Sequence, residues 1–128
     1  MTSPANPAET ILALRPFVPA KDFARSKAFY QALGFRMVRE SKDIAIFELG
    51  AFGFILQDFY VQELAHNFMI QLMVDDVDAW WRTLDCQALV KTFGAQPPRA
   101  PAMQPWGLKV GFIFDPCGPL WHVAEPPA

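Results

Sequence analysis

The stretch Asp22–Gly34, DFARSKAFYQALG, decides the fold of this chain. Its apolar residues recur at helical spacing, and Asp22 stands where a carboxylate can accept from the free amides of a first helical turn. Gly34 supplies the left-handed conformation at which helices commonly end. The stretch therefore predicts a helix that begins after Asp22 and stops at Gly34.

Strand-like segments lie on both sides of this helix. The short apolar run Ile11–Val18 precedes it, and three further segments follow at Phe35–Ser41, Asp43–Leu49 and Phe52–Gln57. The connections between these three segments are short enough to be hairpin turns. The chain up to residue 58 therefore predicts the order β-α-β-β-β.

The same order restarts in the second half of the chain. Phe68–Val74 is strand-like, and Asp76 stands at the position of a helix cap, as Asp22 does in the first half. Five residues after this cap lie at the spacing of one helical face and predict a second helix: Val77, Trp80, Trp81, Leu84 and Ala88.

Three strands are expected to complete the second module. The proline-rich stretch Gln96–Pro105 predicts a loop or an irregular edge strand, because proline cannot donate to a central ladder. Leu108–Phe114 and Leu120–Ala124 are the last two strand-like segments. We therefore expect two βαβββ modules, residues 11–58 and 67–125, after a flexible N-terminal tail of residues 1–10.

Composition and charge exclude several classes of protein. The 128 residues are 52% hydrophobic and 19% charged, which is enough for one packed domain. A net charge of −2 provides no electrostatic footprint for nucleic acid or an anionic membrane, and no apolar stretch approaches the roughly 20 residues of a membrane span. Without an export signal, Cys86 and Cys117 are expected to be reduced thiols in a cytoplasmic protein.

Several motifs resemble the vicinal-oxygen-chelate superfamily, which holds glyoxalase I, extradiol dioxygenases and bleomycin-resistance proteins. They are VPAKD at 18–22, SKAFYQALGF at 26–35, VDDV at 74–77 and DPCG at 115–118. A tryptophan-glycine pair, Trp106-Gly107, is most similar to the bleomycin-resistance branch. The resemblance implies an α+β fold, in which two βαβββ modules form curled mixed sheets around a cavity, and it also implies a homodimer.

The superfamily's enzymes hold a divalent cation with four side chains, which lie on the first and the last strand of each module. By this resemblance the four positions fall on Arg15, Ile55 or Leu56, Met69 and His122. Arginine is always cationic, and isoleucine and leucine carry no donor atom, so we expect no metal and no cofactor. His66 is the only other histidine, and a slip of register would be needed to bring it to a metal position.

Alternation along the strands then predicts what replaces the metal. Arg15 shares a strand face with Ala13 and Phe17, and Met69 shares one with Gln71 and Met73. The opposite faces, which include Leu12 and Leu14, are nearly all apolar and are expected to pack on the helices. Trp106 stands at a loop-to-strand junction, where an aromatic ring can stack on a flat ligand. The resulting ligand-binding set is Arg15, Phe17, Met69, Gln71, Trp106 and His122.

These residues leave more than one function open. The leading hypothesis is a metal-free protein that sequesters a planar aromatic or anionic small molecule in a cavity at a dimer interface. The alternative is a glyoxalase-type lyase or isomerase, or a dioxygenase-like enzyme, with His122 as acid or base and Arg15 as substrate anchor. Structural roles also remain open: Arg15 could pair with Glu48, His122 could be a hydrogen-bonded cavity residue, and the pocket could be vestigial in a chain that only dimerises.

Overall fold

The computed structural model describes residues 7–127, so residues 1–6 of the expected tail lie outside it. The elements follow one another as η1 (Pro7–Thr10), β1 (Phe17–Pro19), α1 (Phe23–Ala32), β2 (Arg36–Glu40), β3 (Ile44–Leu49), β4 (Phe52–Gln57), α2 (Gln62–His66), β5 (Met69–Met73), α3 (Val77–Trp81), α4 (Cys86–Phe93), β6 (Arg99–Met103), β7 (Lys109–Phe114) and β8 (Leu120–Ala124). No helix among these residues is long and apolar enough to cross a membrane.

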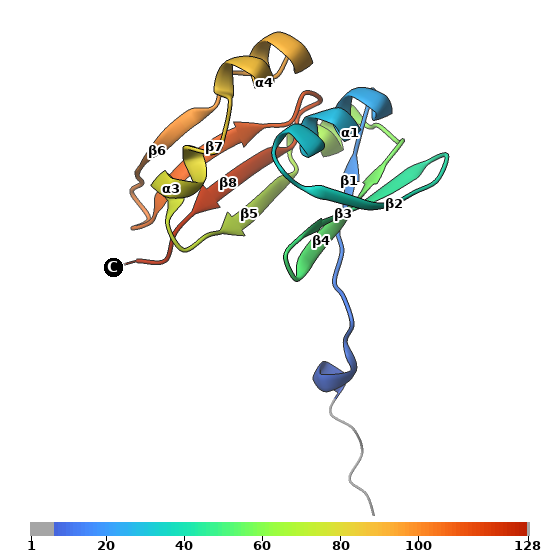
Figure 1. Ribbon diagram of the computed structural model, residues 1–128, viewed down its shortest axis with the longest axis horizontal. Helices are drawn as coiled ribbons and strands as arrows, with labels where there is room; N and C mark the ends of the chain where they lie inside the picture. The colour runs from blue at the N-terminus through green and yellow to red at the C-terminus, as the bar shows by residue number, and fades with distance from the viewer. Residues whose placement is uncertain (1–6, 128) are drawn as a thin grey trace, which may run out of the picture.

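The strands form two four-stranded mixed sheets with the same topology. The strand order is β1-β4-β3-β2 in the first sheet and β5-β8-β7-β6 in the second. In each sheet the first two strands of that order run parallel and the other neighbours run antiparallel. The predicted pair of βαβββ modules is therefore confirmed, and Figure 1 shows the two sheets with α1 and α4 on the same side of the molecule.

The helix that decides the fold begins and ends as its sequence predicts. The backbone amide of Arg25 donates to Asp22 Oδ1 at 3.1 Å, which caps α1. Gly34 follows the helix with φ at +93°, a conformation that costs a residue with a side chain far more. Ser26, Phe29 and Tyr30 form the buried face of α1.

The single second helix predicted from Val77 to Ala88 is wrong, because two short helices stand in its place. Asp76 caps α3 by accepting from the amide of Ala79, as expected. A second cap then appears at Asp85, whose carboxylate accepts from the amide of Ala88 at 3.1 Å and begins α4 in a new direction. The apolar residues at helical spacing therefore belong to two helices, α3 and α4. The short helix α2 was not predicted from the sequence.

The first strand is shorter than the apolar run suggested. Its ladder with β4 begins at Phe17, because Pro16 has no amide to donate and contributes only its carbonyl, to Ile55. Leu12 and Leu14, which were expected to pack on the helices, are instead 99% and 87% exposed. Residues 7–16, which we call the N-terminal arm, run away from the two sheets (Figure 1).

Aromatic rings join the two modules into one core. Trp121 of β8 contacts Phe35, Phe54 and Tyr30 of the first module, with ring centroids 5.5–5.7 Å apart. One face of each sheet therefore packs against this shared core. The other face of each sheet points away from the core, and we call it the open face. The proline-containing β6 is an irregular edge strand with a shift of register, as its sequence predicts.

Candidate functional site

The open face of the second sheet carries most of the predicted ligand-binding residues. Gln71 lies opposite His122 in the register of β5 and β8, while the neighbouring pair Ile70 and Trp121 faces the core. Met69 lies two residues away on the same face and is 65% exposed. The structure thus brings Met69, Gln71 and His122 together on one surface.

An aromatic group surrounds His122 on this face. Phe112 of β7 packs edge-to-face against the imidazole, with ring centroids 4.9 Å apart. Trp106, in the turn before β7, lies 6.3 Å from the imidazole centroid and is 57% exposed, so most of the indole is open to a ligand. The Nε2 atom of His122 is buried and has no hydrogen-bond partner among the described residues.

The open face of the first sheet carries Phe17 and, beside it, Arg15. Phe17 pairs with Ile55 in register and is 52% exposed. Arg15 precedes the strand and lies over Gly53, where its Nε atom is 3.7 Å from the place that a Cβ would occupy. A cavity of about 360 Å³ lies here, and it is lined by residues 11–15 of the N-terminal arm together with Glu48 and Gly53.

The ion pair between Arg15 and Glu48 is not found among the described residues. Glu48 instead has Arg36 as its nearest cationic neighbour, at 3.9 Å. The guanidinium of Arg15 is thus left to interact with solvent or a ligand.

The strand register of the two sheets changes two of the four positions that the family resemblance assigned to metal ligands. His122 lies level with Gln71 rather than Met69, whose partner is Leu120. The resemblance gave Ile55 and Leu56 as alternatives for the position on β4. Ile55 lies on the open face, and Leu56 is fully buried. The residues level with one another are therefore Phe17 with Ile55 and Gln71 with His122. Phenylalanine and isoleucine offer no donor atom, so this chain does not fit the superfamily's four-ligand site.

An acidic cluster elsewhere in the second module has its own partners. Carboxylate oxygens of Asp76, Asp78 and Glu125 lie within 4.8 Å of one another. Asp76 caps α3, Glu125 accepts from the amide of Val77, and the ammonium of Lys109 bonds to Asp78. The lysine supplies the positive charge that such a cluster needs, and we assign the cluster a structural role.

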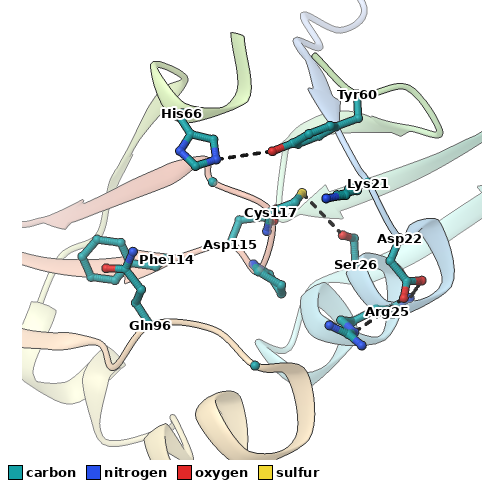
Figure 2. A pocket seen from close by; sticks show the side chains of 13 residues that line it. Lys21, Asp22, Arg25, Ser26, Tyr60, His66, Gln96, Phe114, Asp115 and Cys117 are labelled. Atoms are coloured by element: carbon teal, nitrogen blue, oxygen red, sulfur yellow. Dashed lines mark hydrogen bonds and ion pairs between the residues drawn. The ribbon is translucent and has the colours of Figure 1, made fainter. Parts of the chain in front are cut away.

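A second cavity lies at the junction of the two modules, and we call it the polar cleft (Figure 2). Its volume is about 370 Å³, and its walls come from the start of α1, the linker around α2, the end of α4 and the β7–β8 turn. Figure 2 shows Cys117 in the middle of the cleft, with His66 and Tyr60 above it and Arg25 below it. His66 ends α2 rather than lying on a strand, so it is not placed as a ligand beside His122.

Buried polar groups form the floor of the polar cleft. Asp115 accepts from the hydroxyl of Tyr30 and, at 2.8 Å, from the backbone amide of Cys117. Burial raises the pKa of Asp115 and raises that of the Cys117 thiol to about 12, the latter with help from the nearby Asp115 charge. Cys117 is therefore a neutral thiol rather than a reactive thiolate.

Sequence reasoning missed this cleft. Its residues are spread over five short segments, and the stretch from Asp115 to Gly118 carried the signals of a turn and of a family motif but none of a cavity. The lone signal available was the pair Lys21-Asp22, in which a cation stands directly before the helix cap.

Two mixed four-stranded sheets in βαβββ order, packed on a shared core with both outer faces open, define the class of paired-module proteins that the sequence resembles. The chain belongs to the Glyoxalase/Bleomycin resistance protein/Dioxygenase superfamily, whose family model matches residues 12–123.

Its relatives within the superfamily include bleomycin resistance proteins. One from Klebsiella pneumoniae is 29% identical over 115 residues, which cover 86% of this chain and 89% of that protein. The crystal structure of a bleomycin-binding protein complexed with bleomycin is 26% identical, with a TM-score of 0.73, and the match covers 88% of this chain and 97% of that one. The bleomycin resistance determinant encoded on transposon Tn5 is 27% identical, with a TM-score of 0.69 and coverage of 88% and 95%. The resemblance to this branch is thus confirmed.

Proposed function

We propose that the protein binds and sequesters a small planar anion, without transforming it, on the open faces of its two sheets. The observation that carries this proposal is the group of Trp106, Phe112 and His122. In this group an exposed indole lies beside an imidazole whose buried Nε2 atom has no hydrogen-bond partner among the described residues. Apolar walls with a few converging polar groups are the usual composition of a small-molecule site. The similarity to bleomycin-binding proteins supports binding rather than catalysis.

The charges on the open faces favour an anionic ligand. The register places Arg36 and Arg39 on the open face of the first sheet and Arg99 on that of the second, in addition to Arg15 near Gly53. Glu48 is the one carboxylate that the strand registers place on these two faces. A polycationic drug such as bleomycin favours an acidic groove, so the ligand of this chain differs in charge from bleomycin.

The binding groove is completed by a second copy of the chain. Phe17 and Met69 on the open faces, and Leu12 and Leu14 on the arm, are all more than half exposed in the single chain. Apolar surface of this extent marks a protein interface. A homodimer in which the arm and the open faces of one copy meet those of the other covers this surface and encloses the ligand.

Light scattering of the full chain tests the dimer. We expect twice the mass of 14.4 kDa at micromolar concentration, and loss of the dimer in the double variant Leu12→Glu/Leu14→Glu. The matched control is Lys42→Glu, which changes the charge of an exposed hairpin turn and leaves the dimer intact. A single species of 14 kDa for the wild-type chain would overturn the shared groove.

A fluorescence screen tests the ligand class. Planar aromatic acids should quench or shift the tryptophan emission, and their neutral amides should bind more weakly because they cannot pair with the arginines. The variant Trp106→Phe identifies the responding indole. Equal binding of acids and amides would contradict an anionic ligand.

A lyase or isomerase is the second candidate. It is favoured by the Nε2 atom of His122, which has no partner among the residues that the structure describes, because such a nitrogen could act as a base. Incubation with a glutathione hemithioacetal distinguishes the two candidates. Turnover that is lost in His122→Gln supports the enzyme, and binding without turnover supports sequestration.

A further inference from the structure

The polar cleft at the module junction is separate from the proposed ligand groove. None of Arg15, Gln71, Trp106 and His122 lines it. Its cationic side chains are Lys21, which follows β1, and Arg25 on α1, and His66 at the end of α2 adds an imidazole. Its acidic side chains are Asp22 and Asp115.

Both carboxylates of the cleft already have partners. Asp22 accepts from the backbone amide of Arg25 at 3.1 Å and lies 3.6 Å from the guanidinium of the same residue. Asp115 is 3% exposed and accepts from Tyr30 and from Cys117. Neither carboxylate is left to neutralise the remaining basic groups.

Lys21 and His66, by contrast, have no carboxylate within ion-pair distance in the described part of the chain. The ammonium of Lys21 lies 5.5 Å from the ring centroid of Tyr60, and the hydroxyl of Tyr60 lies 3.3 Å from His66 Nε2. When Nε2 carries a proton and donates it to that hydroxyl, the hydroxyl proton is free for another acceptor. Lys21, Tyr60 and His66 therefore line one cavity as hydrogen-bond donors, and neither Lys21 nor His66 has a carboxylate partner among the described residues.

We propose that the polar cleft is a second binding site, which takes a compact organic oxyanion, a carboxylate or a phosphate ester, on Lys21, Tyr60 and His66. Charge-assisted hydrogen bonds from these groups bind the oxyanion. The volume of about 370 Å³ is at the lower end for small-molecule sites, and Phe114 and Pro116 add an apolar wall for a small organic body.

A ligand at this place contacts both modules. Lys21 belongs to the first module, and Cys117 and Gly118 belong to the turn before the last strand of the second. Because the cleft exists only in the folded chain, its ligand should raise the melting temperature, and the stabilisation should grow with the logarithm of the ligand concentration once that concentration exceeds the dissociation constant.

Amide chemical-shift titrations of the full-length protein test the proposal. The probes are inorganic phosphate, acetate and acetamide, which is a neutral analogue of acetate, all at constant ionic strength so that screening does not change. These probes carry no planar ring that could stack on Trp106, and binding is read at the cleft itself, so an anion bound near Arg15 is distinguished by the amides that shift. The amides of Gln96, Cys117 and Gly118 report on the cleft.

We expect saturable shifts of these amides with phosphate, with acetate, or with both, and none with acetamide. Saturation by phosphate alone assigns a phosphate ester, and saturation by acetate alone assigns a carboxylate. The variant Lys21→Gln should weaken the affinity at least fivefold, and the matched variant Lys42→Gln, in an exposed turn, should bind as the wild type does.

Three results would overturn the second site. They are shifts that rise without saturation, equal shifts with acetate and acetamide, and equal affinities of the Lys21→Gln and Lys42→Gln variants. The proposed ligand groove does not depend on this result, because Arg15 and Trp106 are unchanged in both variants.

Discussion

The indole Nε1 of Trp121 lies 3.1 Å from the hydroxyl oxygen of Tyr30 and donates a hydrogen bond to it. That hydroxyl in turn donates to Asp115, which is buried in the turn before the last strand. The chain of bonds joins the helix of the first module to the last strand of the second. It therefore holds the strand that carries His122, the residue next to Trp121.

Replacing Tyr30 with phenylalanine should destabilise the protein by about 1–3 kcal/mol, because the buried Asp115 carboxylate and the indole N–H both lose a partner. Urea unfolding measures the change. The matched control is Tyr60→Phe. The Tyr60 hydroxyl has the exposed His66 as its one hydrogen-bond partner among the described residues, so its loss should cost less than about 0.5 kcal/mol. Equal losses in the two variants would show that the buried bonds contribute no more than the exposed one.

Local signals in the sequence predicted the sheets and α1 because each signal acts within a few residues. The cap at Asp22, the stop at Gly34 and the alternation of Ile70 and Gln71 all depend on neighbours in the chain. The bond between Tyr30 and Asp115 joins residues 85 positions apart, and no spacing rule gives it.

The predictions from the sequence that were wrong also have physical causes. Asp85 resembles any surface acid until its carboxylate is seen to cap α4. Leu12 and Leu14 look like core residues because a hydrophobic pattern gives no information about whether the chain provides a partner for them. The register of β5 and β8 placed Gln71 opposite His122, since pairing depends on the sheet and not on alignment with relatives.

Replacing Trp106 with alanine should change the free energy of unfolding by less than about 0.5 kcal/mol, because most of the ring is exposed. The comparison is Trp121→Ala, which removes a core ring and should cost about 3–5 kcal/mol. Denaturant melts of the two variants measure both. A large loss in Trp106→Ala would make this residue part of the core and remove it from the ligand site.

Treatment with EDTA should leave the melting temperature unchanged, and added Zn²⁺ or Mn²⁺ should not raise it. The reason is that Phe17 and Ile55 stand where two of four ligands would be needed, and Lys109 already pairs with Asp78 in the acidic cluster. Differential scanning fluorimetry checks this. A metal-dependent rise of several degrees would contradict it, because a ligand that binds only the native state raises its stability.

Stability should fall as the pH rises above 9. Burial raises the pKa of Cys117 from its ordinary value of 9.0 to about 12, and it also holds the pKa of Tyr30 well above 10.0. The unfolded chain therefore loses these protons first, and their ionisation favours unfolding as the pH approaches the folded-state values. Urea melts between pH 8 and about 10.5 measure the slope.

The variant Cys117→Ser should show a shallower loss of stability over this pH range, since serine does not titrate there. Cys86→Ser, which changes the other free thiol, should remain closer to the wild type. A wild-type slope in Cys117→Ser would mean that the buried thiol does not contribute to the alkaline loss.

We propose that Arg15 and Trp106 bind a planar anion, and two dyes that differ only in charge test their roles as a matched pair. The dye 1-anilinonaphthalene-8-sulfonate is an anion with a flat naphthalene ring, and N-phenyl-1-naphthylamine is the same ring system without the sulfonate. Trp106→Ala should weaken the binding of both dyes by about 1–3 kcal/mol, as for other losses of aromatic stacking.

The most direct measurement is the fluorescence titration of both dyes against Arg15→Met, with the exposed Arg82→Met as the control. Arg15→Met should weaken the sulfonate dye by about 1.5–3 kcal/mol, the range for a charge-assisted hydrogen bond, and leave the neutral dye unchanged. Arg82→Met should affect neither dye. Unchanged affinity of Arg15→Met for the sulfonate dye, or an equal loss for both dyes, would contradict the account.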